Sequence, residues 1–538
     1  MIYADNAATT PLCEAALVTM NRLLKDCYGN PSSLYGLGQA AKEELEKARE
    51  EIASLIGACP REIYFTSGGS EADNQAILSA AAIGKRKGKR HIISTAFEHH
   101  AVLHALEKLK KEGFETETGL AGIGTAFKGT WGSGHPVIGF LGEYDALAGM
   151  SQRSMSIEQI PEKEGCPGHG CGHNLLGAGA LSAAVALKDY IGENGMTGTV
   201  VYFGCPAEET ASCKTPMSRD GVFDELDIAI TWHPADNSRV VTETCLTDAM
   251  MVFRFKGKSS HASAAPHLGR SALDAAELFN VGIQFLREHI PDGCRIQYAY
   301  LDVGGQAPNV VQNSASLYYD YRALNNDMAR ELMPRIVRVA EGAAHMTETE
   351  VEWEVTSAMS DYVPNLTLAR IMGEAMEELG PVGFSKEAND FADKMTETIP
   401  ETDKRNSAVN LKAYLGNEEG SRRAELHLQD MPLPYSENVS REMASTDVGD
   451  VSYVVPTVQC KACTETFGTQ LHSWQAVSQG KSAIAHEGMI YAAKVMALTA
   501  AKVVDDPGIT EKIKEEHSVN APYYDCPLPE GIVPKVVR

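Results

Sequence analysis

The sequence has few features of a membrane, secreted or nucleic-acid-binding protein. No apolar run approaches the roughly 18 residues that cross a bilayer, and the N-terminus lacks a basic start followed by an apolar core. Positive charge is scarce, since 48 lysines and arginines face 72 aspartates and glutamates, for a net charge of -24. Nucleic acid and anionic lipid would be repelled. We therefore expect a soluble cytoplasmic protein that binds neither nucleic acid nor membrane.

Cysteines are also sparse for a disulfide-stabilised protein. The twelve cysteines are scattered without a regular spacing, which predicts reduced thiols in a reducing compartment. Cys460 and Cys463 form a CxxC, but no second CxxC accompanies them, so a zinc ribbon is not expected. At 538 residues the chain is too long for one hydrophobic core and predicts several domains.

A short glycine-rich motif carries the strongest chemical signal. Residues 168–174 read Gly-His-Gly-Cys-Gly-His-Asn, which puts the thiol of Cys171 two residues from the imidazole of His173. Glycines allow the sharp backbone turns that let both side chains face one ion. A single Cys or His is more often structural than ligating, so the rest of the pattern decides the interpretation.

Further polar residues follow short apolar runs that predict buried parallel strands. Residues 199–203 lead to Glu208 and Glu209, and residues 228–231 lead to His233, while His472 lies far along the chain. A third run, 137–141, precedes Gly-Glu-Tyr-Asp at 142–145. Ligands of open α/β sheets gather at the carboxyl ends of the strands. One of the two adjacent glutamates can bind the metal while the other acts as a base, so the pattern predicts metal-assisted hydrolysis.

The first 113 residues resemble the N-terminal part of the cysteine desulfurases, pyridoxal-phosphate enzymes of fold type I. The matching pieces are residues 5–10, 29–33, 66–74 and 97–102. The resemblance implies that residues 66–74 hold the cofactor phosphate and that His99 stacks on its ring. The family's Schiff-base lysine, its aspartate and its persulfide cysteine have no counterpart after residue 113, so we expect no pyridoxal phosphate.

From about residue 119 to 497 the chain resembles the dinuclear metal amidohydrolases of aminoacylase and carboxypeptidase-G type, in the aminobenzoyl-glutamate hydrolase branch. Eight motifs occur in order, at 139–147, 168–174, 205–209, 231–234, 259–262, 304–311, 445–450 and 471–474. The resemblance implies an α/β zinc-peptidase-like catalytic domain with an inserted ferredoxin-like α+β dimerisation domain. The partial pyridoxal-phosphate enzyme fragment precedes both.

The same resemblance implies roles for individual residues. Glu208 would be the general base, and two divalent ions, manganese or zinc, would be held by a set of five ligands. These ligands are Cys171, His173, Glu209, His233 and His472. Mixed sulfur, nitrogen and oxygen donors do not select one metal.

Residues 247–356 predict a separate inserted domain with the element order βαββαβ. The resemblance implies that this lid forms a homodimer and that His261 reaches a neighbouring subunit's active site to stabilise the oxyanion. Asn309 and Arg322 would bind the substrate carboxylate, for which a guanidinium suits the geometry. The alternative for Arg322 is a salt bridge within the fold.

These observations predict five segments. They are a truncated desulfurase-like fragment (1–114), two halves of a catalytic domain (115–246 and 357–504), the lid (247–356) and a loosely packed tail (505–538). The fragment replaces the hydrolases' own first helices, so the sheet is expected to lose part of its cover. We predict cleavage of the amide bond of an N-acyl or aminoacyl amino acid, with p-aminobenzoyl-glutamate as one candidate. The alternatives are a desulfurase-derived transferase and an inactive chimera.

Overall fold

The computed structural model describes residues 14–29, 36–56, 100–437, 440–521 and 523–532, with a few single residues (31, 33, 59, 60, 63 and 534). The chain divides into two compact units, Met1–Phe97 and Glu98–Arg538. In the first unit, α1 (Glu14–Asp26) and α2 (Gly36–Ile56) are joined by an ion pair of 3.0 Å between Arg22 and Glu44. Residues 5–10, 66–74 and His99, which carry the desulfurase resemblance, lie outside the described residues.

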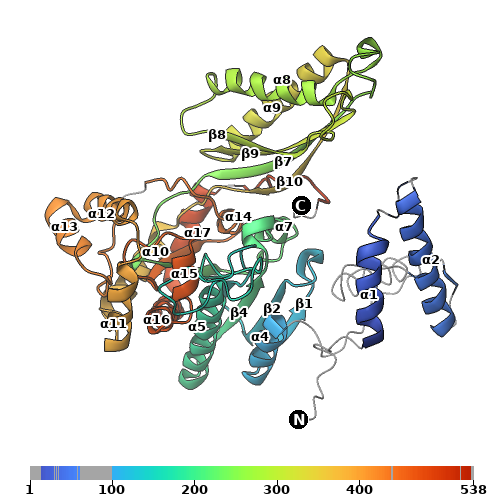
Figure 1. The fold of residues 1–538 in the computed structure, drawn as a ribbon. Coiled ribbons are helices and arrows are strands. Elements are labelled where there is room, and N and C mark those ends of the chain that lie inside the picture. Colours follow the sequence, from blue (N-terminus) through green and yellow to red (C-terminus); the bar gives the residue numbers. More distant parts are fainter. Residues whose placement is uncertain are drawn as a thin grey trace. The chain divides into compact units, whose positions relative to one another are not determined.

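A seven-stranded mixed sheet forms the centre of the second unit (Figure 1). Its order is β1-β2-β4-β3-β5-β11-β6. The strands β4, β3, β5 and β11 pair in parallel, and the pairs β1–β2, β2–β4 and β11–β6 are antiparallel. The strands are β1 (Glu115–Thr118), β2 (Phe127–Ser133), β3 (Val137–Glu143), β4 (Gly198–Cys205), β5 (Ile228–Ala235), β6 (Arg239–Val240) and β11 (Thr457–Cys463). The parallel pairing confirms the prediction for 137–141, 199–203 and 228–231, and it puts the carboxyl ends of β3, β4 and β5 at one edge.

Helices cover both faces of this sheet. The larger core contains residues of α5 (His173–Asn194), α10 (Leu366–Leu379) and α16 (Ala483–Asp505). A smaller core on the other face contains residues of α7 (Lys214–Arg219) and α14 (Val448–Val454). Among the described helices, α5 alone is long and apolar enough to cross a membrane, but half of its most apolar window is buried. It packs on β3, β4 and β5 as a core helix.

The last part of the desulfurase-like segment belongs to this second unit. Helix α4 (His100–Lys111) packs against β1 and β2, and the side chain of Leu109 is fully buried. Leu109 fits because Gly129 has no side chain, since a Cβ there would lie 2.9 Å from the leucine Cδ1. Lys188 of α5 also donates to Glu112 at 2.8 Å. Helix α4 thus lies before the boundary expected at residue 114, and yet it covers part of the sheet of the second unit.

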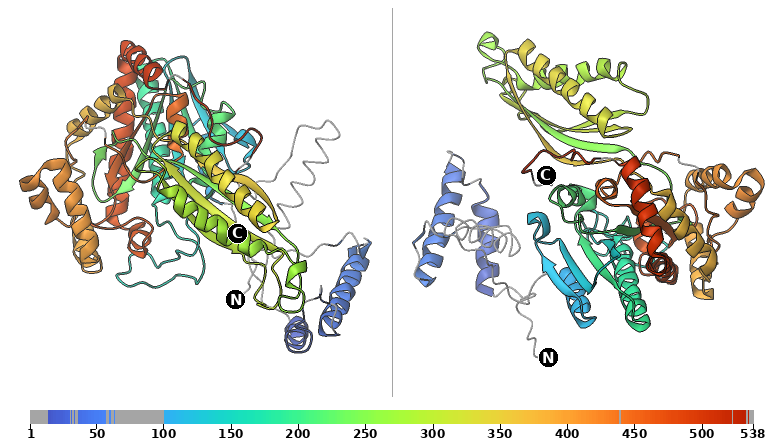
Figure 2. Two further views of the ribbon diagram at one scale, coloured as in Figure 1. Left: turned by 90° about the horizontal axis from the view of Figure 1, so that it is seen from above. Right: turned by 180° about the vertical axis from the view of Figure 1, so that it is seen from behind.

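The lid has the predicted βαββαβ order. Its strands are β7 (Thr247–Lys256), β8 (Arg295–Asp302), β9 (Ser314–Ala323) and β10 (Glu350–Met359), and its helices are α8 (Ala272–Arg287) and α9 (Asn326–Thr347). The antiparallel order β10-β7-β9-β8 is that of a ferredoxin-like sheet. Both helices lie on one side of it, as Figure 2 shows. Phe253, Phe279 and Tyr319 pack in the core between them.

Residues 386–424 are mostly helical. They form α11 (Lys386–Thr396), α12 (Glu401–Leu415) and α13 (Asn417–Ala424). Ser385 caps α11 by accepting a hydrogen bond from the backbone N–H of Ala388. Acidic residues in the first turn of each helix interact favourably with the positive end of the helix dipole. High charge on these helices reflects their exposed faces.

The C-terminal tail corrects the expectation of loose packing. Helix α17 (Pro507–Asn520) buries Ile513, and Leu528 is buried in the core of the lid. The Tyr524 hydroxyl donates to Asp450 of α14 at 2.8 Å. Arg219 of α7 donates to the Ile532 carbonyl at 2.8 Å. The tail thus contacts both the catalytic domain and the lid. Composition could not predict this packing because it depends on a few buried apolar side chains.

We expect Leu528→Ala to destabilise the lid by about 2–4 kcal/mol, because it leaves a cavity in a closed core. Thermal and urea unfolding of the full chain would measure the loss. Val519→Ala is the matched control, since Val519 is 77% exposed. Equal stability of the two variants would contradict the assigned packing.

Candidate metal centre

The predicted ligands converge at the carboxyl edge of the parallel strands. The Cys171 sulfur and the ligand nitrogens of His173 and His233 lie within 4.8 Å of one another. The same sulfur lies within 4.8 Å of a Glu209 oxygen and a His472 nitrogen, in a second group of three. Within these groups, Cys171 Sγ is 3.4 Å from His233 Nε2, and His472 Nε2 is 3.1 Å from Glu209 Oε1. All five predicted ligands are therefore brought together, and Cys171 is common to both groups.

Asp145 orients two of these residues from behind. One carboxylate oxygen lies 2.9 Å from His173 Nδ1, and the other accepts the backbone N–H of Glu209 at 3.0 Å. His233 Nδ1 donates in the same way to the carbonyl of Pro234 at 2.8 Å. Each ring therefore keeps Nε2 for a ligand, the usual arrangement around metal-bound histidines.

The backbone around the centre is bent in unusual ways. Ala207, which precedes the two glutamates, has φ +54°, and His472 has φ +60°, both in the left-handed region. Residues other than glycine adopt this backbone conformation at a cost in free energy, and such residues cluster at functional sites. His472 reaches the centre because its backbone N–H donates to Gly170, where a Cβ would lie 3.2 Å from His472 Cα. The glycines of the motif thus allow two distant segments to approach.

The protonation of the centre reflects a shortage of positive charge. Burial raises the pKa of the Cys171 thiol, and Glu209 and Glu208 raise it further. Burial alone would lower the pKa of His173, but Asp145 and Glu143 outweigh it and raise the pKa to about 9. The pKa of His233 falls to about 4, through burial and the neighbouring His173. Divalent cations at these donors would favour the thiolate and neutral imidazoles that ligate metals.

One buried atom faces a carboxylate as well as the other candidate ligands. His173 Nε2, whose side chain is about 1% exposed, makes no hydrogen bond and lies 3.2 Å from Glu143 Oε2, with which it pairs only when the ring is protonated. In the neutral ring this buried nitrogen has a lone pair and no donor, which a divalent metal ion would satisfy.

Glu208 occupies the first turn of the short helix α6 (Glu208–Ala211) and faces the same region. One of its oxygens lies within 4.8 Å of Glu143 and His173 ligand atoms. Burial, then the charges of Glu143 and Asp447, raise the pKa of Glu208 well above its usual value. A raised carboxyl pKa beside a metal centre is typical of a proton-transferring group.

The lid residues lie elsewhere in the subunit. The backbone N–H of Ala262, next to His261, donates to the Asn309 carbonyl at 2.9 Å, so His261 and Asn309 are neighbours on exposed loops. Arg322 lies toward the other end of β9, eight positions from Ser314, or roughly 27 Å at about 3.4 Å per residue. It forms ion pairs with Asp248 at 3.0 Å and Asp320 at 3.4 Å, so the salt-bridge alternative is present.

Several residues of the site had no role assigned from the sequence. Glu143 and Asp145 stood in a recognised motif at a strand end, and that position could have flagged them. Lys214 contacts both Glu143 and Asp447, but it carries no motif of its own. Cys460 and Cys463 are buried on β11 and join no metal-ligating group among the described residues.

Comparison with known proteins finds hydrolase relatives for most of the chain. The chain is 41% identical over 441 residues to one of the subunits of p-aminobenzoyl-glutamate hydrolase from Escherichia coli K12, covering 81% of this chain and 92% of the relative. Residues 249–347 match the peptidase dimerisation domain of the M20 peptidases. A solved structure of a putative aminohydrolase from Staphylococcus aureus has the same fold, with a TM-score of 0.52 at 18% identity over 76% of this chain and 93% of that one.

The N-terminal segment has different relatives. Residues 2–118 match the class-V aminotransferases. A putative cysteine desulfurase of Bacillus subtilis 168 is 49% identical over 114 residues, which cover 21% of this chain but only 30% of the desulfurase. The chain therefore holds less than a third of that enzyme, in accordance with the truncated fragment expected from the sequence.

We expect Asp145→Asn to weaken metal binding about 10–100-fold, because the neutral amide no longer supports His173 and Glu209 as the carboxylate does. Competition titration with a chromogenic chelator would measure the affinity. Asp224→Asn, at an exposed position, is the control. Equal affinities of the Asp145 variant and the parent would contradict this role.

Proposed function

Since the chain belongs to the M20 peptidase family, in the p-aminobenzoyl-glutamate hydrolase branch, we propose that its substrate is p-aminobenzoyl-glutamate or a similar N-acyl amino acid. The chain is a metal-dependent amidohydrolase, and the choice of substrate within that class is the proposal. The observation that supports it most is the position of Cys171 in two groups of ligand atoms, beside the spare carboxylate of Glu208.

We assign one ion to Cys171, His173 and His233 and a second to Cys171, Glu209 and His472, with manganese or zinc as the metals. Bound there, the ions would supply Lewis acidity and lower the pKa of a water molecule toward neutrality. Glu208 accepts the proton of the attacking water and returns it to the leaving nitrogen. Its neighbour Glu209 lies beside His472 as a candidate metal ligand, so it cannot also serve as the general base.

His261 has the protonation that an oxyanion donor needs. Its Nδ1 accepts backbone N–H groups of Ser263 at 3.3 Å and Ala264 at 3.1 Å. In the neutral ring the proton therefore resides on Nε2, which can donate to a developing negative charge. We propose that His261 acts in the site of a second subunit. Asn309 accompanies it, whereas Arg322, which lies toward the far end of β9, would contact the substrate carboxylate from the other subunit.

A homodimer through the lid would bring these groups together. Strand β8 is an edge of its sheet, and apolar side chains are exposed there and on α8. They include Val281 and Phe285 on α8, at 50% and 66% exposure, and Leu301 and Val303 at the end of β8, at 40% each. An unpaired edge with an exposed apolar patch is typical of a protein interface.

We expect Glu208→Gln to lower kcat at least about 10²–10⁴-fold while both metals stay bound, because the amide cannot accept the proton. Hydrolysis of p-aminobenzoyl-glutamate and metal analysis of the same sample would test this. Glu193→Gln, at the exposed end of α5, is the control. Retained activity of the Glu208 variant would refute the assigned base.

Subunit mixing tests the role of His261. We expect Glu208→Gln and His261→Ala to be inactive separately and to recover about a quarter of wild-type activity after exchange. Half of the dimers would then be mixed, each with one complete site of two. Affinity tags would verify the mixed dimers. If verified mixed dimers stay inactive, His261 does not act across the interface.

A further inference from the structure

Lys214 is a fully buried lysine at the start of α7, close to the proposed base. Its side chain is 0% exposed, although lysine is almost never buried without a partner. An unpaired ammonium in the interior would cost several kcal/mol. The surrounding side chains must therefore provide negative charge.

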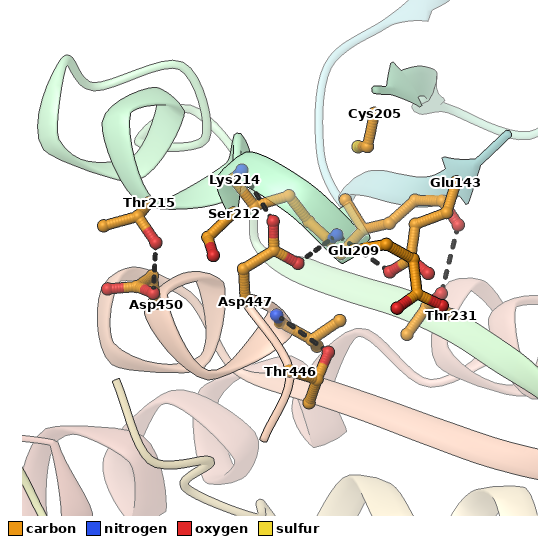
Figure 3. A network of polar contacts seen from close by, with 12 residues as sticks. Glu143, Cys205, Glu209, Ser212, Lys214, Thr215, Thr231, Thr446, Asp447 and Asp450 are labelled. Carbon is orange, nitrogen blue, oxygen red and sulfur yellow. Dashed lines mark hydrogen bonds and ion pairs between the residues drawn. The ribbon is translucent and has the colours of Figure 1, made fainter. Parts of the chain in front are cut away.

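Two carboxylates surround its ammonium group (Figure 3). Lys214 Nζ lies 2.8 Å from Glu143 Oε1 and also forms a buried ion pair with Asp447 Oδ1. The second oxygen of Asp447 accepts the backbone N–H of Lys214 at 2.9 Å, so that one carboxylate holds both ends of the residue. Burial alone would lower the pKa of Lys214, but Asp447 and Glu143 outweigh it and raise the pKa well above its usual value. The ammonium thus stays charged.

Glu143 connects this ion pair to the metal centre. Its other oxygen, Oε2, is 3.2 Å from His173 Nε2, the atom without a hydrogen-bond partner. Oxygens of Glu143 and Glu208 and a nitrogen of His173 also form a compact group within 4.8 Å. Such a group could itself hold a cation, but the ammonium already pairs with Glu143. Lys214 therefore supplies positive charge where two carboxylates face each other.

The segment that carries Lys214 is held firmly. The Thr215 hydroxyl lies 2.7 Å from Asp450 Oδ2 and 2.8 Å from the Ala358 carbonyl, where the lid's last strand ends. Ser212 Oγ lies 2.9 Å from Ser357 Oγ, and the backbone of Ser212 is left-handed with φ +48°. These contacts fix the chain between the proposed base and Lys214, so the ammonium cannot move away without disturbing the base.

We propose that Lys214 is a positioning residue for the hydrolysis, which fixes the Glu143 carboxylate beside His173 and Glu208 and thereby orients both. This inference rests on the proposed function. Lys214 touches neither substrate nor metal in this account, and it acts through Glu143. Asp447 is its second anchor.

The test uses the full-length, metal-loaded enzyme and p-aminobenzoyl-glutamate, with Lys214→Met and Lys214→Arg. We expect Lys214→Met to lower kcat about 10–100-fold per metal-loaded subunit, with KM changed less than about threefold. Two ions should remain bound, and Lys214→Arg should restore part of kcat because it keeps the charge. The acid limb of the kcat–pH profile should also move in Lys214→Met, which a purely structural role would not cause.

The control is Lys188→Met, a largely buried lysine that pairs with Glu112 and Asp189 away from the centre. If Lys214→Met does not fold, Glu143→Gln carries the same test, since it removes the carboxylate through which Lys214 acts and leaves the ammonium paired with Asp447. Unchanged kcat and pH profile in the folded variants would overturn the inference. An inactive parent enzyme would instead contradict the proposed function, so the two failures are distinguishable.

Discussion

The carboxylate of Asp145 holds two parts of the metal centre in a fixed relation. One oxygen binds the His173 ring at the start of α5, and the other binds the backbone of Glu209 at the start of α6. These helices follow different strands, so their relative position depends on the parallel pairing of β3 with β4. The sheet gives the approximate placement, and the carboxylate gives the orientation that a ligand set needs.

Negative charge exceeds positive charge around this point. Glu143, Asp145, Glu208, Glu209 and Asp447 lie close to the ammonium of Lys214 and to the imidazoles of His173, His233 and His472. Like charges at this density would disfavour folding unless protons or cations compensate them. Lys214 compensates one side of the group, and the proposed metal ions would compensate the other. The stability of the centre and its chemistry thus depend on the same balance of charges.

The convergence of the candidate ligands could be predicted from the sequence because they stand in short motifs, one of which, that of His233, follows the apolar run 228–231. The lid could be predicted from the order of its elements. Lys214 could not, because its burial depends on Asp447, 233 residues away. Leu528 escaped prediction because the surrounding tail is rich in charge and proline. Helix α4 lies in the segment that matches the desulfurases, and its packing on the hydrolase sheet could not be predicted because its apolar pattern suits either fold.

The central claim is that the chain, with its desulfurase-like N-terminal segment, is a metal-dependent amidohydrolase. The most direct test is to follow release of glutamate from p-aminobenzoyl-glutamate by the purified full-length protein, with manganese or zinc and after chelation. We predict release that requires metal and two ions per chain in the active sample. A folded protein with two ions bound that releases no amino acid, or hydrolysis that persists after chelation, would contradict the account.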